Sequence, residues 1–217
     1  MRKSILLLVL ALSAAFAFSQ DIALSKAPAK LGVDVLDAIR ARSAARVFVK
    51  GDLPLADLSA IVWAADGLKG TPDAISSASK AGGTFPVSGE VNYISLYVLT
   101  EKGVYRYIPE SNLLKQLGAK DERGSVTSEN IAAAAFMLFF TYDAAKLPSF
   151  VKGNAAAGKD MAMGTASYGG ENAALVAAGL KLASIVMYNV APAAAASAAK
   201  LSKDEAPLFI MQLGYTK

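Results

Sequence analysis

The chain has 217 residues, of which 54% are hydrophobic, a formal net charge of +4, and no histidine or cysteine. Without these two residue types it has no histidine acid/base catalysis, no Ser-His-Asp or Cys-His nucleophile, no disulfide, and no metal site that needs imidazole or thiolate. Carboxylate, lysine, hydroxyl or cofactor chemistry remains, in a chain whose length suits one domain.

Residues 1–19 are typical of a secretory signal peptide. Arg2 and Lys3 precede an apolar stretch of about 14 residues that ends in small side chains. A membrane anchor is the alternative, but crossing a bilayer takes about 20 apolar residues. No cysteine follows that could carry a lipid, and there is no twin arginine. We therefore expect cleavage after Ala17 or Ser19 and export to a bacterial periplasm, with no stable membrane span afterwards.

The charge left after cleavage does not favour nucleic acid as a partner. Removing Arg2 and Lys3 leaves 20 basic and 18 acidic residues. The lysines are scattered, and no basic stripe interleaved with aromatic residues follows the chain, as tracking of a phosphate backbone would require.

The first part of the mature chain predicts two helices. A polar lead-in, residues 20–32, precedes apolar residues at helical spacing over 33–40. A second helix is predicted within 54–67, with proline at its start and glycine near its end. Residues 70–83 are rich in Gly, Ser, Thr and Pro, which indicates a surface loop.

Strands and helices alternate through the rest of the chain. Residues 91–99 and 103–108 are β-branched and aromatic and predict a hairpin. The later expected elements are a short helix over 112–117, a helix beginning at Ser128, a buried strand over 136–141, a polar connection over 143–164, an alanine-rich helix over 165–181, a strand over 184–188, a helix over 193–201 and a strand over 207–213. This pattern predicts a single domain over 33–217, either α+β or α/β.

Two motif matches point to other chemistry, and each is incomplete. Residues 153–160 nearly match a phosphate-binding loop, but Asp160 stands where Ser or Thr should hold magnesium, so a solvated turn is the alternative. Residues 77–80 match S-x-x-K and residues 128–130 match S-x-N, as in penicillin-recognising serine enzymes where lysine activates serine. The third element, K-T-G on a late strand, is absent. A Ser-Lys periplasmic hydrolase stays a remote alternative.

An arginine cluster at the end of the first predicted helix is the better candidate for a binding site. Arg42 and Arg46 lie four residues apart, so their planar guanidinium groups can converge on one anion. An ordinary solvated helix end explains the same residues, and the cluster alone leaves both interpretations open.

The cluster resembles the nitroreductase family of flavoproteins, whose first helix ends in a pattern like R-R-S-x-R-x-F. Arg42, Arg46 and Phe48 fall in register with it. Further segments resemble the family's L-x-x-A-A-x-G, P-S-A-G-A-L-Y-P, Q-N-L, L-G-S-V and final G-Y patterns in family order: residues 63–67, 84–98, 171–175, 182–185 and 207–215. The resemblance covers the chain from about residue 33 onward.

The resemblance implies an α+β fold with a central, mainly antiparallel or mixed sheet flanked by helices. It also implies a homodimer with FMN at the subunit interface, and no metal site. Because the flavin carries the redox step, no catalytic side chain is required. The cofactor-binding residues implied by the resemblance are Arg42, Ser43, Ala44, Arg46, Pro86, Val87, Ser88, Gly89, Asn92, Ala183, Ser184 and Lys217.

The chain departs from the family patterns at the cofactor site. Ala44 and Val87 replace serines, and Lys181 and Ala183 replace glycines; a lost hydrogen bond costs on the order of 1 kcal/mol. Two functions are therefore open. The first is an exported FMN-dependent oxidoreductase that passes electrons from a reduced donor to a small acceptor, such as a nitro compound or quinone. The second is a non-catalytic periplasmic flavin- or ligand-binding module, because a chain exported unfolded must acquire FMN outside the cytoplasm.

Overall fold

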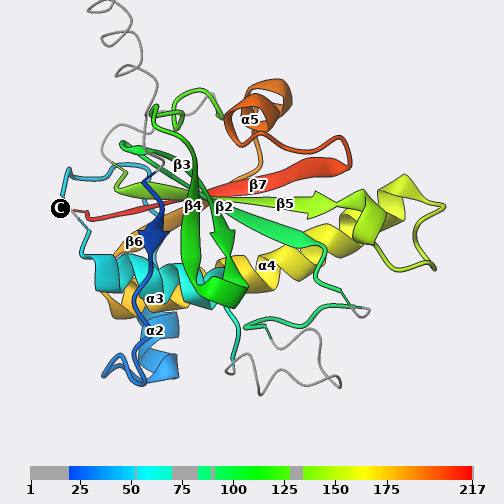
Figure 1. Ribbon diagram of the computed structural model, residues 1–217. Coiled ribbons are helices and arrows are strands. Elements are labelled where there is room, and N and C mark those ends of the chain that lie inside the picture. Colours follow the sequence, from blue (N-terminus) through cyan, green and yellow to red (C-terminus); the bar gives the residue numbers. More distant parts are fainter. Residues whose placement is uncertain (1–19, 52, 70–82, 89–90, 128–133, 217) are drawn as a thin grey trace, which may run out of the picture.

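The computed structural model describes residues 20–51, 53–69, 83–88, 91–127 and 134–216. Within these residues seven strands form one antiparallel sheet, in the spatial order β1-β4-β3-β2-β5-β7-β6 (Figure 1). The strands are β1 (Ile22–Ala23), β2 (Ile94–Thr100), β3 (Gly103–Ile108), β4 (Leu113–Gly118), β5 (Phe136–Asp143), β6 (Ala183–Met187) and β7 (Glu205–Gly214). The predicted α+β class with a mainly antiparallel sheet is confirmed.

Helices cover both faces of the sheet. They are α2 (Val35–Ala41), α3 (Leu55–Asp66), α4 (Ala155–Gly179) and α5 (Pro192–Ala198), with short 3-10 turns η1 (Pro109–Ser111) and η2 (Ala144–Lys146). α3 and α4 pack on one face, and α5 lies on the other (Figure 1). The central strands β2, β5 and β7 are therefore buried on both faces, which explains why their sequences are continuously apolar rather than alternating.

The hairpin predicted over 91–108 is confirmed as β2 and β3, whereas the short helix predicted over 112–117 is wrong. That segment is β4, which pairs with β3 on one side and β1 on the other. Asn112 adopts a left-handed backbone, with φ of 49°, directly after η1. This reverses the chain, and Leu114 becomes fully buried. Pairing between strands outweighs the local helical spacing here.

The polar connection predicted over 143–164 is also wrong, because α4 begins at Ala155 and its first three turns occupy the end of that stretch. Asn154 caps the helix by accepting a hydrogen bond from the Ala157 N–H at 3.1 Å. Gly158 faces Leu147, whose Cδ1 would lie 2.7 Å from an added Cβ. The glycine that suggested a loop thus permits close packing, and the phosphate-loop and solvated-turn interpretations of residues 153–160 both give way to helix.

The predicted lead-in contributes to the sheet. Ile22 and Ala23 form the edge strand β1, and Leu24 beside them is buried. The signal peptide over 1–19, most of the loop over 70–83, the motif residues 77–80 and 128–130, and the helix start at Ser128 lie outside the described residues. In the described part of the chain, no helix combines the length and the apolar character needed to cross a bilayer.

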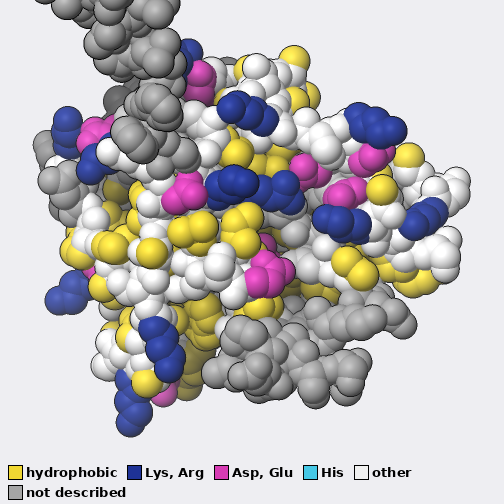
Figure 2. Space-filling model, in the orientation of Figure 1, with side chains coloured by type: hydrophobic (Ala, Val, Ile, Leu, Met, Phe, Trp, Pro, Cys, Tyr) yellow, Lys and Arg dark blue, Asp and Glu magenta, His cyan; other side chains and the backbone are white. Residues whose placement is uncertain are grey.

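Charges on the surface are mixed. Basic and acidic side chains lie among one another across the face in Figure 2, and several form close pairs, such as Lys120 with Glu122 at 2.9 Å and Lys146 with Asp143 at 3.2 Å. Exposed pairs of this kind contribute about 0–1 kcal/mol each. The fold therefore depends on its apolar core.

Candidate functional site

The arginine loop, residues 42–46, is joined to the edge of the sheet at the start of β6. Arg42 ends α2, and its N–H donates to the Ala38 carbonyl at 2.9 Å. The Ser184 N–H donates to the Ser43 carbonyl at 3.4 Å, and Ala44 forms a parallel bridge with Ser184. Two parts of the predicted site that are far apart in the sequence are thus brought side by side.

Side-chain exposure in this region follows a simple pattern. Arg42, Ser43, Ala44 and Arg46 are exposed. Ala183 and Ser184, which the loop meets at the start of β6, are buried, and Ala183 packs against Phe48 and Ala134. The loop therefore presents two arginines and one serine to solvent beside a buried segment of small residues. Exposed guanidinium groups can bind an anion with charge-assisted hydrogen bonds.

The end of β7 lies against the same loop. The Val49 N–H donates to the Tyr215 carbonyl at 2.8 Å. Gly214 faces Phe48, whose Cδ1 would lie 3.0 Å from an added Cβ. Because Gly214 has no side chain, Phe48, just after the arginine loop, can lie close to β7. Lys217, predicted to assist the anion, lies outside the described residues.

The second part of the predicted site, around Pro86, Val87 and Ser88, is tied to α3 and α4. The Thr84 N–H donates to the Gly67 carbonyl at 2.9 Å, just past the end of α3. Asn172 on α4 donates its side-chain amide to the Thr84 carbonyl at 3.0 Å. Pro86 and Ser88 are exposed and Val87 is partly buried, while Gly89 lies outside the described residues.

Asn92 connects the far end of this loop to a buried carboxyl. Its Nδ2 donates to Asp66 Oδ1 at 2.9 Å, and its Oδ1 accepts from the Ile94 N–H at 2.9 Å. Asp66 is 4% exposed. Burial raises the pKa of Asp66 well above its usual value, and the hydrogen bond from Asn92 opposes that shift only in part. These hydrogen bonds hold the chain in place at Asn92, and its contact with a cofactor stays a prediction.

The two parts of the predicted site lie at different places along α4. Phe85 contacts the middle of α4, where its Cδ1 would be 3.2 Å from a Cβ added at Gly169. Gly179, at the end of α4, faces Leu31 and Val33 just before α2. Ten helical residues separate the two glycines, a rise of about 15 Å. Within one chain, the Pro86 segment is anchored to mid-α4 and the arginine loop lies beyond the end of that helix.

Comparison with known proteins identifies the family to which this α+β chain belongs. The sequence model of the Nitroreductase family matches residues 39–215. The chain therefore belongs to the Nitroreductase family. A search of curated proteins found no match.

Solved structures share the fold. A structure described as that of a nitroreductase from Ralstonia eutropha JMP134 has a TM-score of 0.78 at 24% identity, covering 91% of this chain and 90% of that one. A second, from Anabaena variabilis ATCC 29413, has a TM-score of 0.72 at 20% identity and covers 93% of this chain, which spans only 42% of that longer one. The NADPH:FMN oxidoreductase of Vibrio harveyi has a TM-score of 0.55 at 15% identity, covering 84% and 69%.

Family membership supports a flavin oxidoreductase in general, because members of this family typically bind FMN. No metal-binding group of three or more His, Cys, Asp or Glu residues is found among the described residues.

Two residues with clear roles at the site were absent from the sequence prediction, namely Asp66 and Asn172. Asn172 belongs to a segment that resembles the family, so its position carried a signal, whereas the role of Asp66 depends on burial and carried none.

Proposed function

We propose that the protein is an exported FMN-dependent oxidoreductase that passes electrons from a reduced donor to a small acceptor, such as a nitro compound or a quinone. The observation that carries this proposal is the attachment of the arginine loop to Ser184 at the start of β6. Protein purified from the periplasm of an expressing bacterium should be yellow and should begin after Ala17 or Ser19. Colourless protein that leaves the fluorescence of added FMN unchanged would contradict the flavin assignment.

The residues present fit the phosphate end of FMN. Arg42 and Arg46 carry permanent positive charge, and Ser43 adds a hydroxyl on the same exposed loop. Ala183 and Ser184 are buried by the chain itself, so they support the loop from within. Ala44 supplies no hydroxyl, so binding at this loop relies on the two guanidinium groups and Ser43.

The chemistry follows from what each group can do. Bound FMN supplies the electron transfer. Arg42 and Arg46 hold and orient the phosphate, while the bond between Ser43 and Ser184 keeps the loop at a fixed distance from the sheet. Ala183 and Ser184 are buried, so water is excluded from the sheet side of the loop. Solvent can provide the proton that a reduced acceptor requires, so the chain needs no histidine for that step.

Arg46→Ala should weaken FMN binding by about 2 kcal/mol, roughly 30-fold, because a charge-assisted contact to phosphate is lost. Lys146→Ala is the control, since Lys146 lies on η2, away from α2 and the arginine loop, and pairs with Asp143 at 3.2 Å. That variant should bind FMN as the unchanged protein does. Titration followed by quenching of flavin fluorescence measures both. Equal affinities for all three proteins would remove Arg46 from the site.

A second copy of the chain is the proposed partner. α2 buries only Ala38, while Val35, Leu36 and Ile39 are 60%, 55% and 52% exposed. Val47, just past the arginine loop, is 76% exposed. Exposed apolar side chains grouped beside a binding loop are typical of an interface. A homodimer formed there would place the FMN site between subunits, and we propose that the Pro86 segment of the second copy completes it.

Leu36→Asp should therefore convert a dimer into a monomer and weaken FMN binding together with it. A charge on the exposed face of α2 has no effect on the core but opposes burial in an interface. Sedimentation velocity gives the assembly state, and far-ultraviolet circular dichroism checks the fold. Leu55→Asp is the control, because Leu55 is 45% exposed at the start of α3, outside the α2 surface. A wild-type monomer that binds FMN normally would contradict the proposed interface.

A non-catalytic binding module is the second candidate. The observation that favours it is Ala44, which is exposed beside Ser184 at the position where a hydroxyl would otherwise face the cofactor. Anaerobic reduction of the bound flavin, followed by addition of a nitroaromatic compound or a quinone, separates the two candidates. Reoxidation faster than that of free flavin supports the enzyme, and reoxidation no faster supports the module.

A further inference from the structure

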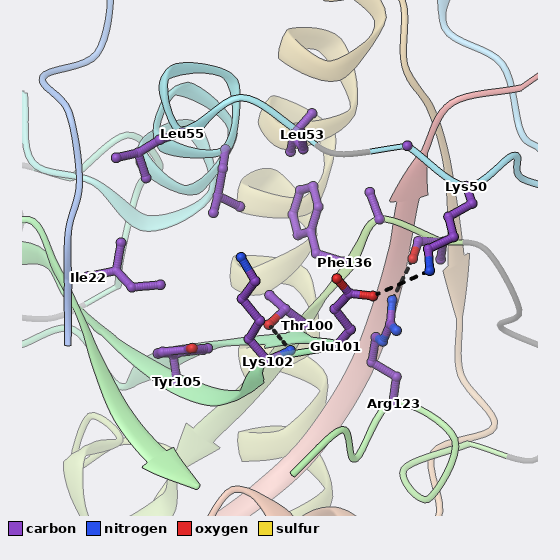
Figure 3. A pocket seen from close by; sticks show the side chains of 14 residues that line it. Ile22, Lys50, Leu53, Leu55, Thr100, Glu101, Lys102, Tyr105, Arg123 and Phe136 are labelled. Atoms are coloured by element: carbon purple, nitrogen blue, oxygen red, sulfur yellow. Dashed lines mark hydrogen bonds and ion pairs between the residues drawn. The ribbon is translucent and has the colours of Figure 1, made fainter. Parts of the chain in front are cut away.

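A cavity of about 550 Å³ lies between the start of α3, the turn joining β2 to β3, and the start of β5 (Figure 3). Its volume falls in the range of small-molecule sites, about 300–1,000 Å³. Leu53, Leu55 and Leu58 give it an accessible apolar wall, whereas Phe136, which also borders it, is only 1% exposed. Figure 3 shows the Phe136 ring directed into the space between Leu53 and the β2–β3 turn.

Basic side chains dominate the opposite wall. Lys50, Lys102 and Arg123 line the cavity, and Glu101 is the one acidic residue among the described lining residues. Glu101 lies 4.0 Å from Lys50, so these two charges offset each other. The side chain of Lys102 extends into the cavity (Figure 3), and the positive charge that remains there is accessible to a ligand.

Arg123 is held rigidly at the edge of this wall. Its side chain is 13% exposed, and it contacts Asp121 Oδ2 at 2.7 Å through Nη2 and Oδ1 at 3.0 Å through Nε. Its Nη1 donates to the Ala134 carbonyl at 2.6 Å. A guanidinium group has five N–H donors, and these bonds use three. Asp121 offsets the charge of Arg123, as Glu101 offsets that of Lys50. Among the described lining residues Lys102 therefore carries the uncompensated charge, and the two remaining donors of Arg123 can add hydrogen bonds to a ligand.

The cavity adjoins the proposed flavin site but has different lining residues. None of the arginine loop, the Pro86 segment, Ala183 or Ser184 lines it. Ala134, which does line it, packs against Ala183. A ligand in the cavity would therefore contact other residues than those proposed for FMN.

We propose that this cavity binds a small organic anion, a carboxylate that carries an aromatic or branched apolar group. The apolar body packs against Leu53, Leu55 and Leu58, and the carboxylate faces Lys102 and Arg123. A cavity lined by apolar side chains and by a cationic one favours a ligand that has both an apolar group and a negative charge. A neutral analogue loses the charge contacts, and a simple inorganic anion loses the apolar ones.

Calorimetric titration of the purified protein with 2-naphthoate and with its neutral analogue 2-naphthamide tests the proposal. The carboxylate should bind at least tenfold more tightly than the amide. Lys102→Met removes the charge but keeps a long apolar stem, and it should abolish this preference without weakening the amide. Lys115→Met, on the exposed side of β4, is the matched control and should behave as the unchanged protein does.

Arg123→Met should also reduce the preference, but this substitution removes structural hydrogen bonds. If the Arg123 variant does not fold, the Lys102 variant decides the test. Equal affinities for the two probes, an unchanged preference in Lys102→Met, or no binding of 2-naphthoate would overturn the proposal. Repeating the titration in saturating FMN tests separateness. Unchanged 2-naphthoate affinity supports a distinct site, and competition would show that the probe occupies the flavin site instead.

Discussion

Gly169→Ala should lower the free energy of unfolding by about 1–3 kcal/mol, the usual cost of overpacking a well-packed core. Gly169 lies where α4 crosses α3, and an added Cβ would press against the Ala65 carbonyl oxygen. It would also lie 3.2 Å from Phe85 and 3.3 Å from Phe140. Backbone cannot move aside as a flexible side chain can, so the two helices must separate.

Gly164→Ala on the same helix is the control. A Cβ at Gly164 meets nothing within 4 Å, and alanine is favoured over glycine in a helix by about 1 kcal/mol. That variant should therefore be more stable than the unchanged protein. Urea unfolding of all three proteins measures the differences. Equal gains in stability for both variants would show that α3 and α4 are not in close contact at Gly169.

Asp66→Asn should make the protein more stable at neutral pH and remove a dependence of stability on pH. Burial keeps the pKa of Asp66 raised in the folded state, whereas in the unfolded chain an aspartate ionises near about pH 4. Between those two values the folded protein binds the extra proton. Stability then falls as pH rises, by at most about 1.4 kcal/mol per pH unit, and levels off above the raised pKa. Asparagine has no such proton and can still accept from Asn92.

The groups around Asp66 set the size of this effect. Glu110 raises the pKa of Asp66 further and Arg106 lowers it. Elsewhere, hydrogen bonds from Arg123 and Ser125 lower the pKa values of Asp121 and Glu122, which makes the protein less stable as pH falls. Those contributions are present in both proteins and cancel in the difference. Unfolding in urea from about pH 4 to about pH 8 should show a difference that grows with pH; a constant difference would contradict the prediction.

The helices and strands that could be predicted are those that leave a recognisable pattern of residue types in the sequence. β5 was predicted because residues buried on both faces must be continuously apolar, β2 and β3 because their β-branched and aromatic residues flank a turn, and α3 because proline opened a helical repeat. β4 was missed, since its strand character comes from pairing with β1 and β3. The early start of α4 was missed because Gly158 serves packing against Leu147 rather than a turn.

The part of the candidate site that could be predicted is the part that follows a family pattern. The arginine loop and residues 183–184 were predicted from a family pattern, and the structure brings them together. The supporting contacts could not be predicted, because the roles of Asp66 and Asn172 arise from burial and from bonds to distant backbone. The cationic cavity combines Lys50, Lys102 and Arg123 from three separate segments, and no spacing in the sequence relates them.

The position of β7 has a consequence for the timing of folding. β7 is the last strand along the chain, yet it lies inside the sheet between β5 and β6. β5 and β6 are joined into one sheet only when residues 205–214 have paired with both of them. Long-range pairing of this kind is slow to form. Closure of the central layer is therefore expected to be a late step in folding, which waits for β7.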